Sequence, residues 1–412
     1  MSLIQPFPGW RPRPDRVREV AAPPYDVLNR TEAATMARGN PHSFLHVSKA
    51  EIDLDPKISP HDAQVYQRAR HNFLAMQESG ILLQDSCPSL YVYRLVQGGH
   101  QQTGLVAAIS VDAYLTDRVK KHEHTRPDKE DDRTRIADTL GANSGPVFLT
   151  YRHERSIDQV LDQVVRREPV FDFVADDGIR HTLWVVSEKA FIDQLVGLFD
   201  TLAALYIADG HHRAAAASRV SRARRAERGS CTGEEPFNRF MGVMFPDDQV
   251  RILEYNRVVR DLSGMTPETF LARVAERFDL QPDNQPVQPD RPHVFGMFLR
   301  DRWYRLTCRI DLASLQDPIA RLDVSILQNH LLEPLLEIKN PRVDDRIDFV
   351  GGIRGLTGLV ERVRSGEMAV AFSLHPTSVT DLMTVADAGG VMPPKSTWFE
   401  PKLRDGMVIQ GI

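Results

Sequence analysis

Residues 206–213, YIADGHHR, combine the residue types that bind phosphate. An apolar run ends at Asp209, and a strongly helix-forming, alanine-rich run follows. We expect Asp209 to cap this helix, because its carboxylate can accept a backbone N–H of the first turn. The free N–H groups and the positive end of the helix dipole favour an anion. His211, His212 and Arg213 would add side-chain donors. The segment thus predicts a phosphate site, and the alternative is a capped helix with surface histidines.

Residues 120–133, KKHEHTRPDKEDDR, form a second candidate. A single carboxylate, Glu123, stands between His122 and His124, with lysines before it and Arg126 after it. Such surroundings keep a carboxylate ionised and able to take a proton, while the cations bind a polyanion. The pattern indicates a general base beside a phosphate donor. The alternative is a solvated charge run that leads into a helix.

The third candidate lies near the C-terminus, at residues 392–402, MPPKSTWFEPK. Lys395 follows a Pro-Pro turn, and Ser396 and Thr397 supply two hydroxyl groups. An ammonium group and hydroxyls are suited to a phosphate or a carboxylate. By its residues alone, the segment is better explained as a docked tail.

Metal binding is an alternative role for the histidines and the carboxylate of these motifs. His122, Glu123, His124, His211 and His212 include the ligand types of a zinc site, but the adjacent lysine pair disfavours a dication. Magnesium held mainly by substrate phosphates fits better. The sequence has no GxxxxGK[ST] loop, no GxGxxG and no kinase HRD/DFG set. Phosphate chemistry would therefore use another scaffold.

Composition limits the class of protein. The chain has 412 residues, a formal net charge of -5 and three cysteines. This length suggests two or three domains. The acidic balance disfavours nucleic acid as the main partner, and the few cysteines suit a reducing compartment. We find no signal-peptide core and no apolar run of membrane-spanning length. We therefore expect a cytoplasmic protein with a small-molecule substrate, and a homodimer is a further option.

The elements that must position these motifs alternate between strand and helix. Residues 1–30 are proline-rich and predict extended chain rather than helix. A proline-rich stretch at 281–292 predicts a linker. The expected fold class is α/β (α+β), with a mixed sheet. The clearest predicted strands are 90–95, 105–111, 147–151, 202–208, 239–246, 250–259, 293–298, 303–309 and 368–373, and the helices are 60–80, 156–165, 189–199, 210–228, 267–278, 323–336, 354–364 and 378–388.

Five motifs together resemble a known family. PFPGWRP, AAPPYDVL, KKHEHTRPDKEDDR, DGHHR and MPPKSTWF closely resemble the bacterial family catalogued as domain of unknown function 1015. Its members are often labelled as relatives of the chromosome-partitioning ParB proteins. The resemblance spans nearly the whole chain. The family label implies a ParB-like core but names no activity.

A more distant resemblance is to the free-serine kinase of the ParB-like fold. That kinase has a Pro-His-Glu element, a strand that ends in Asp-Gly-His-His-Arg, and a late Pro-Lys-Thr-Thr segment. The resemblance implies that Glu123 is the general base on the serine hydroxyl and that Asp209 assists catalysis or holds Mg²⁺. It implies phosphate or substrate binding by the remaining candidates: His122, His124, Arg126, Gly210, His211, His212, Arg213, Lys395, Ser396 and Thr397.

The resemblance also implies a domain plan. We expect an N-terminal extension at 1–100 packed on the core, a ParB-like catalytic core at 101–280, and a C-terminal α/β domain at 293–412. The last domain would close over the site and bring Lys395 to it. The kinase lacks the N-terminal part, and about 85 residues separate Glu123 from the DGHHR strand here.

The function predicted from these arguments is transfer of a phosphoryl group to the hydroxyl of free L-serine or a similar acceptor. ADP, ATP and pyrophosphate all present the same phosphate edge, so each remains a donor, with Mg²⁺ as the expected cofactor. One alternative is a phosphohydrolase, such as a phosphoserine phosphatase. The other is a ParB-like nucleotide switch, although the ParB box GERRxRA is replaced here by DGHHRAAA.

Overall fold

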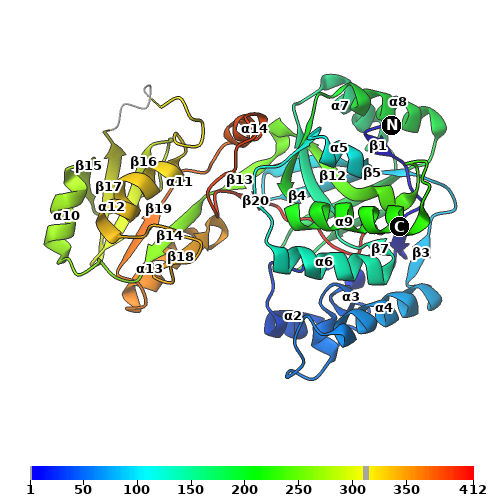
Figure 1. The fold of residues 1–412 in the computed structure, drawn as a ribbon, viewed down its shortest axis with the longest axis horizontal. Coiled ribbons are helices and arrows are strands. Elements are labelled where there is room, and N and C mark those ends of the chain that lie inside the picture. Colours follow the sequence, from blue (N-terminus) through cyan, green and yellow to red (C-terminus); the bar gives the residue numbers. More distant parts are fainter. Residues whose placement is uncertain (1, 310–314) are drawn as a thin grey trace. The chain divides into compact units, whose positions relative to one another are not determined.

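The computed structural model describes residues 2–309 and 315–412 and has a mixed α/β fold, as predicted (Figure 1). It divides into two compact units. Unit 1 contains the described residues up to Val250 together with Pro401–Ile412, and unit 2 contains Arg251–Glu400. No helix among the residues described is long and apolar enough to cross a membrane.

Unit 1 is built on a large mixed sheet. Its strands lie in the order β6-β11-β8-β12-β5-β4-β10-β9, and β1 also pairs with β5. β11 runs parallel to β6, and β12 runs parallel to β8, while the other pairs are antiparallel. The strands of unit 1 are β1 (Ile4–Gln5), β2 (Trp10–Pro12), β3 (Leu82–Gln84), β4 (Leu90–Gln97), β5 (His100–Ser110), β6 (Val119–Lys120), β7 (Ala142–Asn143), β8 (Val147–Tyr151), β9 (Phe171–Val174), β10 (Arg180–Val186), β11 (Leu205–Asp209), β12 (Arg239–Pro246) and β21 (Gln410–Gly411).

Helices cover this sheet in layers. Apolar side chains of α7, α8 and α9 share one buried core with the central strands. Beyond α9 come α6 and then α4, and a second core lies between α6 and the N-terminal helices (Figure 1). The helices of unit 1 are α1 (Val17–Val20), α2 (Arg30–Ala37), α3 (Leu45–Ser48), α4 (Ala63–Glu78), α5 (Val111–Leu115), α6 (Pro127–Leu140), α7 (Arg155–Val164), α8 (Lys189–Thr201) and α9 (His211–Arg228), with 3-10 turns η1 (Ala50–Asp53), η2 (Pro236–Asn238) and η3 (Asp247–Gln249).

Both ends of the chain belong to unit 1. The N-terminal segment forms β1 and β2, but the prediction that it is entirely non-helical is wrong, because α1 forms where residues 17–20 contain no proline. The C-terminal strand β21 pairs with β7. An antiparallel bridge joins Ala22 to Asp405, so the two terminal segments lie side by side.

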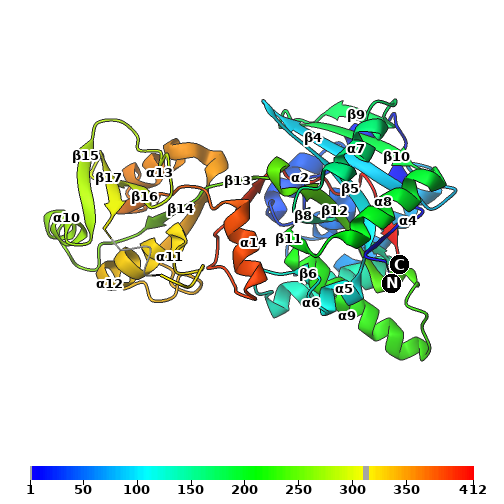
Figure 2. The ribbon, with the colours of Figure 1, turned by 90° about the horizontal axis from the view of Figure 1, so that it is seen from above.

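Unit 2 has an antiparallel sheet in the order β15-β17-β16-β19-β14-β18 (Figure 1), and Figure 2 shows β15, β17, β16 and β14 of this sheet from above. The prediction of a linker at 281–292 is wrong. This stretch lies within unit 2, and its first residues extend β15 against β17, since Pro282 tolerates an edge strand. The elements are β13 (Arg251–Leu253), β14 (Tyr255–Val259), β15 (Phe278–Asp283), β16 (Val294–Leu299), β17 (Arg302–Cys308), β18 (Ile347–Gly351), β19 (Val370–Ser373), β20 (Trp398–Glu400), α10 (Pro267–Ala275), α11 (Asp323–Leu327), the π-turn η5 (Gln328–Leu332), α12 (Glu333–Leu336), η6 (Gly352–Arg354), α13 (Gly355–Arg364) and α14 (Val379–Asp387).

Candidate functional site

The turn between β11 and α9 forms the centre of the site. Asp209 is the last residue of β11, and Gly210 is the N-cap of α9 with a φ of 96°. A positive φ of this kind favours glycine. The expected cap by Asp209 is wrong, since α9 has no side-chain cap and the Asp209 carboxylate instead accepts a hydrogen bond from Lys402 Nζ at 2.8 Å. The N-terminus of α9 is thus left without a side-chain cap.

Asp209 is held in its charged form. Burial raises the pKa of Asp209, but the Lys402 ammonium and the Arg213 guanidinium outweigh burial and hold it well below its usual range. The side chain remains about one third exposed. The end of β11 therefore carries a fixed carboxylate–ammonium pair beside the helix N-terminus.

Two buried histidines lie next to this turn. The rings of His122 and His211 are nearly perpendicular, with centroids 4.5 Å apart, and the backbone N–H of His122 donates to His211 Nε2 at 3.5 Å. Burial lowers the pKa of His122 to about 4 and holds that of His211 well below its usual value. Both rings are therefore neutral near pH 7. The buried Nδ1 of His122 has no hydrogen-bond partner within the described part of the chain.

Glu123 follows His122 in the chain, and its side chain extends to the N-terminal end of α9. Its Oε2 lies 3.8 Å from His211 Nδ1, and its side chain is half exposed. Because His211 Nε2 accepts a backbone N–H, the ring proton belongs on Nδ1, facing Glu123. The backbone N–H of Arg126 likewise donates to His212 Nε2 at 3.1 Å. The loop thus brings an accessible carboxylate to the helix N-terminus.

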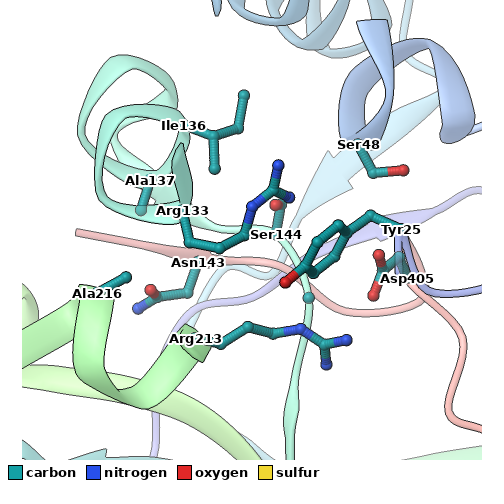
Figure 3. Close-up of a pocket in the computed structure, with 11 residues that line it drawn as sticks. Tyr25, Ser48, Arg133, Ile136, Ala137, Asn143, Ser144, Arg213, Ala216 and Asp405 are labelled. Atoms are coloured by element: carbon teal, nitrogen blue, oxygen red, sulfur yellow. The ribbon is translucent and has the colours of Figure 1, made fainter. Parts of the chain in front are cut away.

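A small cavity adjoins this site. It has a volume of about 40 Å³ and lies between α6, α9, the N-terminal segment and the C-terminal tail (Figure 3). The Tyr25 ring separates two guanidinium groups, that of Arg133 at 3.7 Å and that of Arg213 at 5.5 Å from the ring centroid. Asp405 lines the cavity and is almost fully buried, at 3% exposure. The cavity is therefore lined by both signs of charge.

The remaining candidates of unit 1 lie at different depths. Arg213 is directed toward the carbonyl of Pro146 and the carboxylate of Asp26, so two of its nitrogens face protein groups. His124 and Arg126 are exposed, and Arg126 pairs with Asp128 at 2.8 Å. The structure thus groups His122, Glu123, Asp209, Gly210, His211 and His212 at the start of α9, with Arg213 on its inner side.

The predicted C-terminal residues belong to unit 2. Lys395 is exposed, with its Nζ 5.4 Å from the centre of the Tyr255 ring. The Ser396 hydroxyl donates to the carbonyl of Pro393 at 2.6 Å, and Thr397 is partly buried. Sequence reasoning selected this lysine and missed Lys402, which ends the same motif and is the ammonium that binds Asp209.

Tyr25, Arg133 and Asp405 were also missed. Tyr25 lies within AAPPYDVL and Arg133 is the last residue of the charged run. Both segments were singled out in the sequence, but these two residues were not predicted to belong to the site. Asp405 lies in a tail that carries no chemical motif. Its role emerges only when the tail pairs with residue 22.

The predicted Mg²⁺ site at Asp209 can be compared with the groups that surround this carboxylate. The described residues contain no group of three or more His, Cys, Asp or Glu side chains able to hold a metal ion. Asp209 is a single carboxylate with an ammonium on one oxygen. Magnesium that keeps several waters and binds substrate phosphates needs only one or two protein carboxylates. Asp209 fits that role and does not fit a site made of protein ligands alone.

We expect acid to destabilise the fold through His122. The unfolded chain takes up this proton near pH 6.5, whereas the folded chain takes it up only near pH 4. The free energy of unfolding therefore decreases by up to about 3 kcal/mol as pH falls through that window. Urea unfolding of wild type and His122→Gln at pH steps from 7.5 to 4 would measure it. The exposed His71→Gln is the control, and equal slopes for wild type and His122→Gln would contradict the assignment.

We expect Lys402→Met to destabilise the protein by about 1–3 kcal/mol, because it leaves Asp209 partly buried without its ammonium. Adding Asp209→Asn should recover part of this loss. The exposed pair Lys189–Asp193 serves as the control, for which Lys189→Met should cost no more than about 0.5 kcal/mol. The measurement is a double-mutant cycle by urea unfolding. Additive losses at Lys402 and Asp209 would show that the pair is not coupled.

Comparisons with known proteins give one family match and several similar solved structures. A family model described as "Protein of unknown function (DUF1015)" matches residues 4–325. No curated protein matches the sequence. Among solved structures, a free serine kinase in complex with AMP is 15% identical, with a TM-score of 0.34, and the match covers 71% of this chain and 86% of that chain. A variant of free serine kinase in complex with ADP gives 15% identity and a TM-score of 0.34, covering 71% and 87%. A conserved hypothetical protein from Pyrococcus furiosus gives 14%, a TM-score of 0.34, and 73% and 93%.

Proposed function

Since the chain belongs to the DUF1015 family, whose description names no activity, we propose a function from its own site. The protein is a small-molecule phosphotransferase. It moves a phosphoryl group from a nucleotide or pyrophosphate to the hydroxyl of free L-serine or a similar acceptor. The observation that carries the proposal is the accessible Glu123 carboxylate held at the uncapped N-terminus of α9.

The start of α9 is suited to the phosphates of the donor. The backbone N–H groups at the very start of α9 and the helix dipole attract an anion, and the Lys402 ammonium lies beside them on Asp209. The buried Nδ1 of His122 has no hydrogen-bond partner among the described residues, and an ordered water would donate a hydrogen bond to it. These groups supply positioning and charge neutralisation, which are the main requirements of phosphoryl transfer.

Glu123 takes the proton in this proposal. The acceptor hydroxyl gives its proton to the Glu123 carboxylate while its oxygen forms a bond to phosphorus. The bond from phosphorus to the leaving phosphate oxygen breaks, and the electron pair stays on the leaving group. The neutral His211, with its Nδ1–H toward Glu123, keeps the carboxylate oriented.

Magnesium would contact Asp209 and the phosphate oxygens of the donor. When bound, it neutralises charge on those oxygens. Asp209 is suited to this contact because it stays ionised across the physiological pH range.

The test is phosphorus NMR of the purified protein with Mg²⁺ and L-serine, with ATP, ADP and pyrophosphate offered in parallel. We expect a phosphomonoester signal that requires serine and is lost in Glu123→Gln. Orthophosphate without an ester, with serine present or absent, would identify a hydrolase. No change with any donor would overturn the proposal and favour a binding protein.

A further inference from the structure

Three residues that line the cavity in Figure 3 each have a buried polar atom with no hydrogen-bond partner among the described residues. These atoms are Ser48 Oγ, Arg213 Nε and Asp405 Oδ1, and they come from α3, α9 and the C-terminal tail. Ser48 and Asp405 are 6% and 3% exposed. A buried polar atom without a partner destabilises the fold, because it has lost its hydrogen bonds to water. Three such atoms around one cavity indicate a ligand.

We propose that this cavity binds the head group of a free α-amino acid. The α-carboxylate accepts from Arg213 Nε and the Ser48 hydroxyl. The α-ammonium donates to the Asp405 carboxylate.

The charges around the cavity exclude simpler ligands. Arg133 is neutralised by Asp132, to which its Nε donates at 2.9 Å. The outer nitrogens of Arg213 face Pro146 and Asp26. In the described part of the chain, the buried atoms of the lining that still need a partner are one guanidinium N–H, one hydroxyl and one carboxylate oxygen. A simple anion would satisfy the N–H but face Asp405, and a simple cation would do the reverse. A zwitterion satisfies both.

The size and the walls agree with a head group. A volume of about 40 Å³ holds roughly three water-sized groups, the number of polar atoms in an ammonium and a carboxylate. Gly145 leaves this space open, because a Cβ there would lie 2.6 Å from Asp405 Oδ1. Tyr25 is only partly buried and precedes the exposed Asp26, so the ligand side chain would leave past this edge.

Arg213 joins the cavity to the site at β11 and α9, since its charge also lowers the pKa of Asp209. Under the proposed function the bound amino acid is the phosphoryl acceptor, and that identification rests on the proposed function. The binding claim itself does not.

Isothermal titration calorimetry at pH 8 tests the claim, with four small molecules added to the full-length protein. L-Serine and L-alanine carry both head-group charges, lactate lacks the ammonium, and ethanolamine lacks the carboxylate. We expect both amino acids to bind, and lactate and ethanolamine to bind at least tenfold more weakly. Absence of amino-acid binding would mean that the cavity holds water only, and equal binding of lactate would remove the role of Asp405. Either result overturns the proposal.

Variants locate the binding. Asp405→Asn should weaken L-serine binding at least tenfold, and Ser48→Ala about threefold or more, because each removes a group that binds the ligand. Neither new side chain is larger than the one it replaces, so neither fills the cavity. The exposed Asp193→Asn is the matched control. Wild-type affinity in both cavity variants would overturn the assignment, and Ser48→Ala decides if Asp405→Asn does not fold. Serine binding to the cavity without phosphoryl transfer would refute the proposed function and leave this site standing.

Discussion

Glu123→Gln is expected to lower kcat for phosphoryl transfer by about 10²–10⁴-fold, because loss of a positioned general base has effects of this size. The Kd for the donor nucleotide should change by no more than about threefold. The carboxylate stands 3.8 Å from His211 Nδ1 and is half exposed, so the amide fits the same space. Transfer is measured by phosphorus NMR or coupled assay, and donor binding by calorimetry.

The control for this variant is Glu227→Gln, an exposed carboxylate near the far end of α9. It removes one carboxylate charge without touching the site, and its kcat should match that of wild type. Equal loss of turnover and of donor binding in Glu123→Gln would show that Glu123 binds the donor instead of acting as the base.

Asp405→Asn is expected to change the pH dependence of stability. Burial raises the pKa of Asp405 to about 7, against 3.8 in an exposed chain. Between these two values the folded state holds a proton that the unfolded state has lost. The stability that this proton contributes is fully present below about pH 3.8 and is lost as pH rises through 7. By pH 8 the free energy of unfolding of wild type should fall by up to about 4 kcal/mol, and Asp405→Asn should not show this loss.

Urea unfolding of the two proteins from pH 4 to 8.5 measures the difference. Asp193→Asn, on the surface of α8, should follow wild type across the range. Parallel profiles for wild type and Asp405→Asn would mean that the carboxylate is ionised throughout. L-Serine should reduce the difference at pH 8, since an ammonium on Asp405 stabilises the charged form.

The regular elements follow directly from the sequence. Strands β8 and β12 have exactly their expected ranges, and α9 begins within one residue of its expected start. These segments have strong apolar periodicity, and Gly210 marks the break between strand and helix. The short helices α1, α2 and α3 were not predicted, since segments of four to eight residues carry little periodic signal and are stabilised by tertiary packing.

The motif residues could also be predicted from the sequence, but the residues that they contact could not. The types and spacing of residues 122–123 and 209–213 were enough to mark a candidate phosphate site. They could not reveal that Asp209 binds Lys402, 193 positions away, in place of its own helix. A carboxylate at a strand end caps the next helix or pairs with a distant cation, and only the path of the C-terminal tail decides between them.

The same reason applies to the cavity. Tyr25, Ser48 and Asp405 are unremarkable in the sequence, and they meet Arg213 of the DGHHR motif because the two terminal segments pair across unit 1. Local sequence determines which segments form helices and strands, and which residue types can bind phosphate. Long-range packing determines which polar atoms are buried together, because burial without a partner is a property of the assembled fold alone.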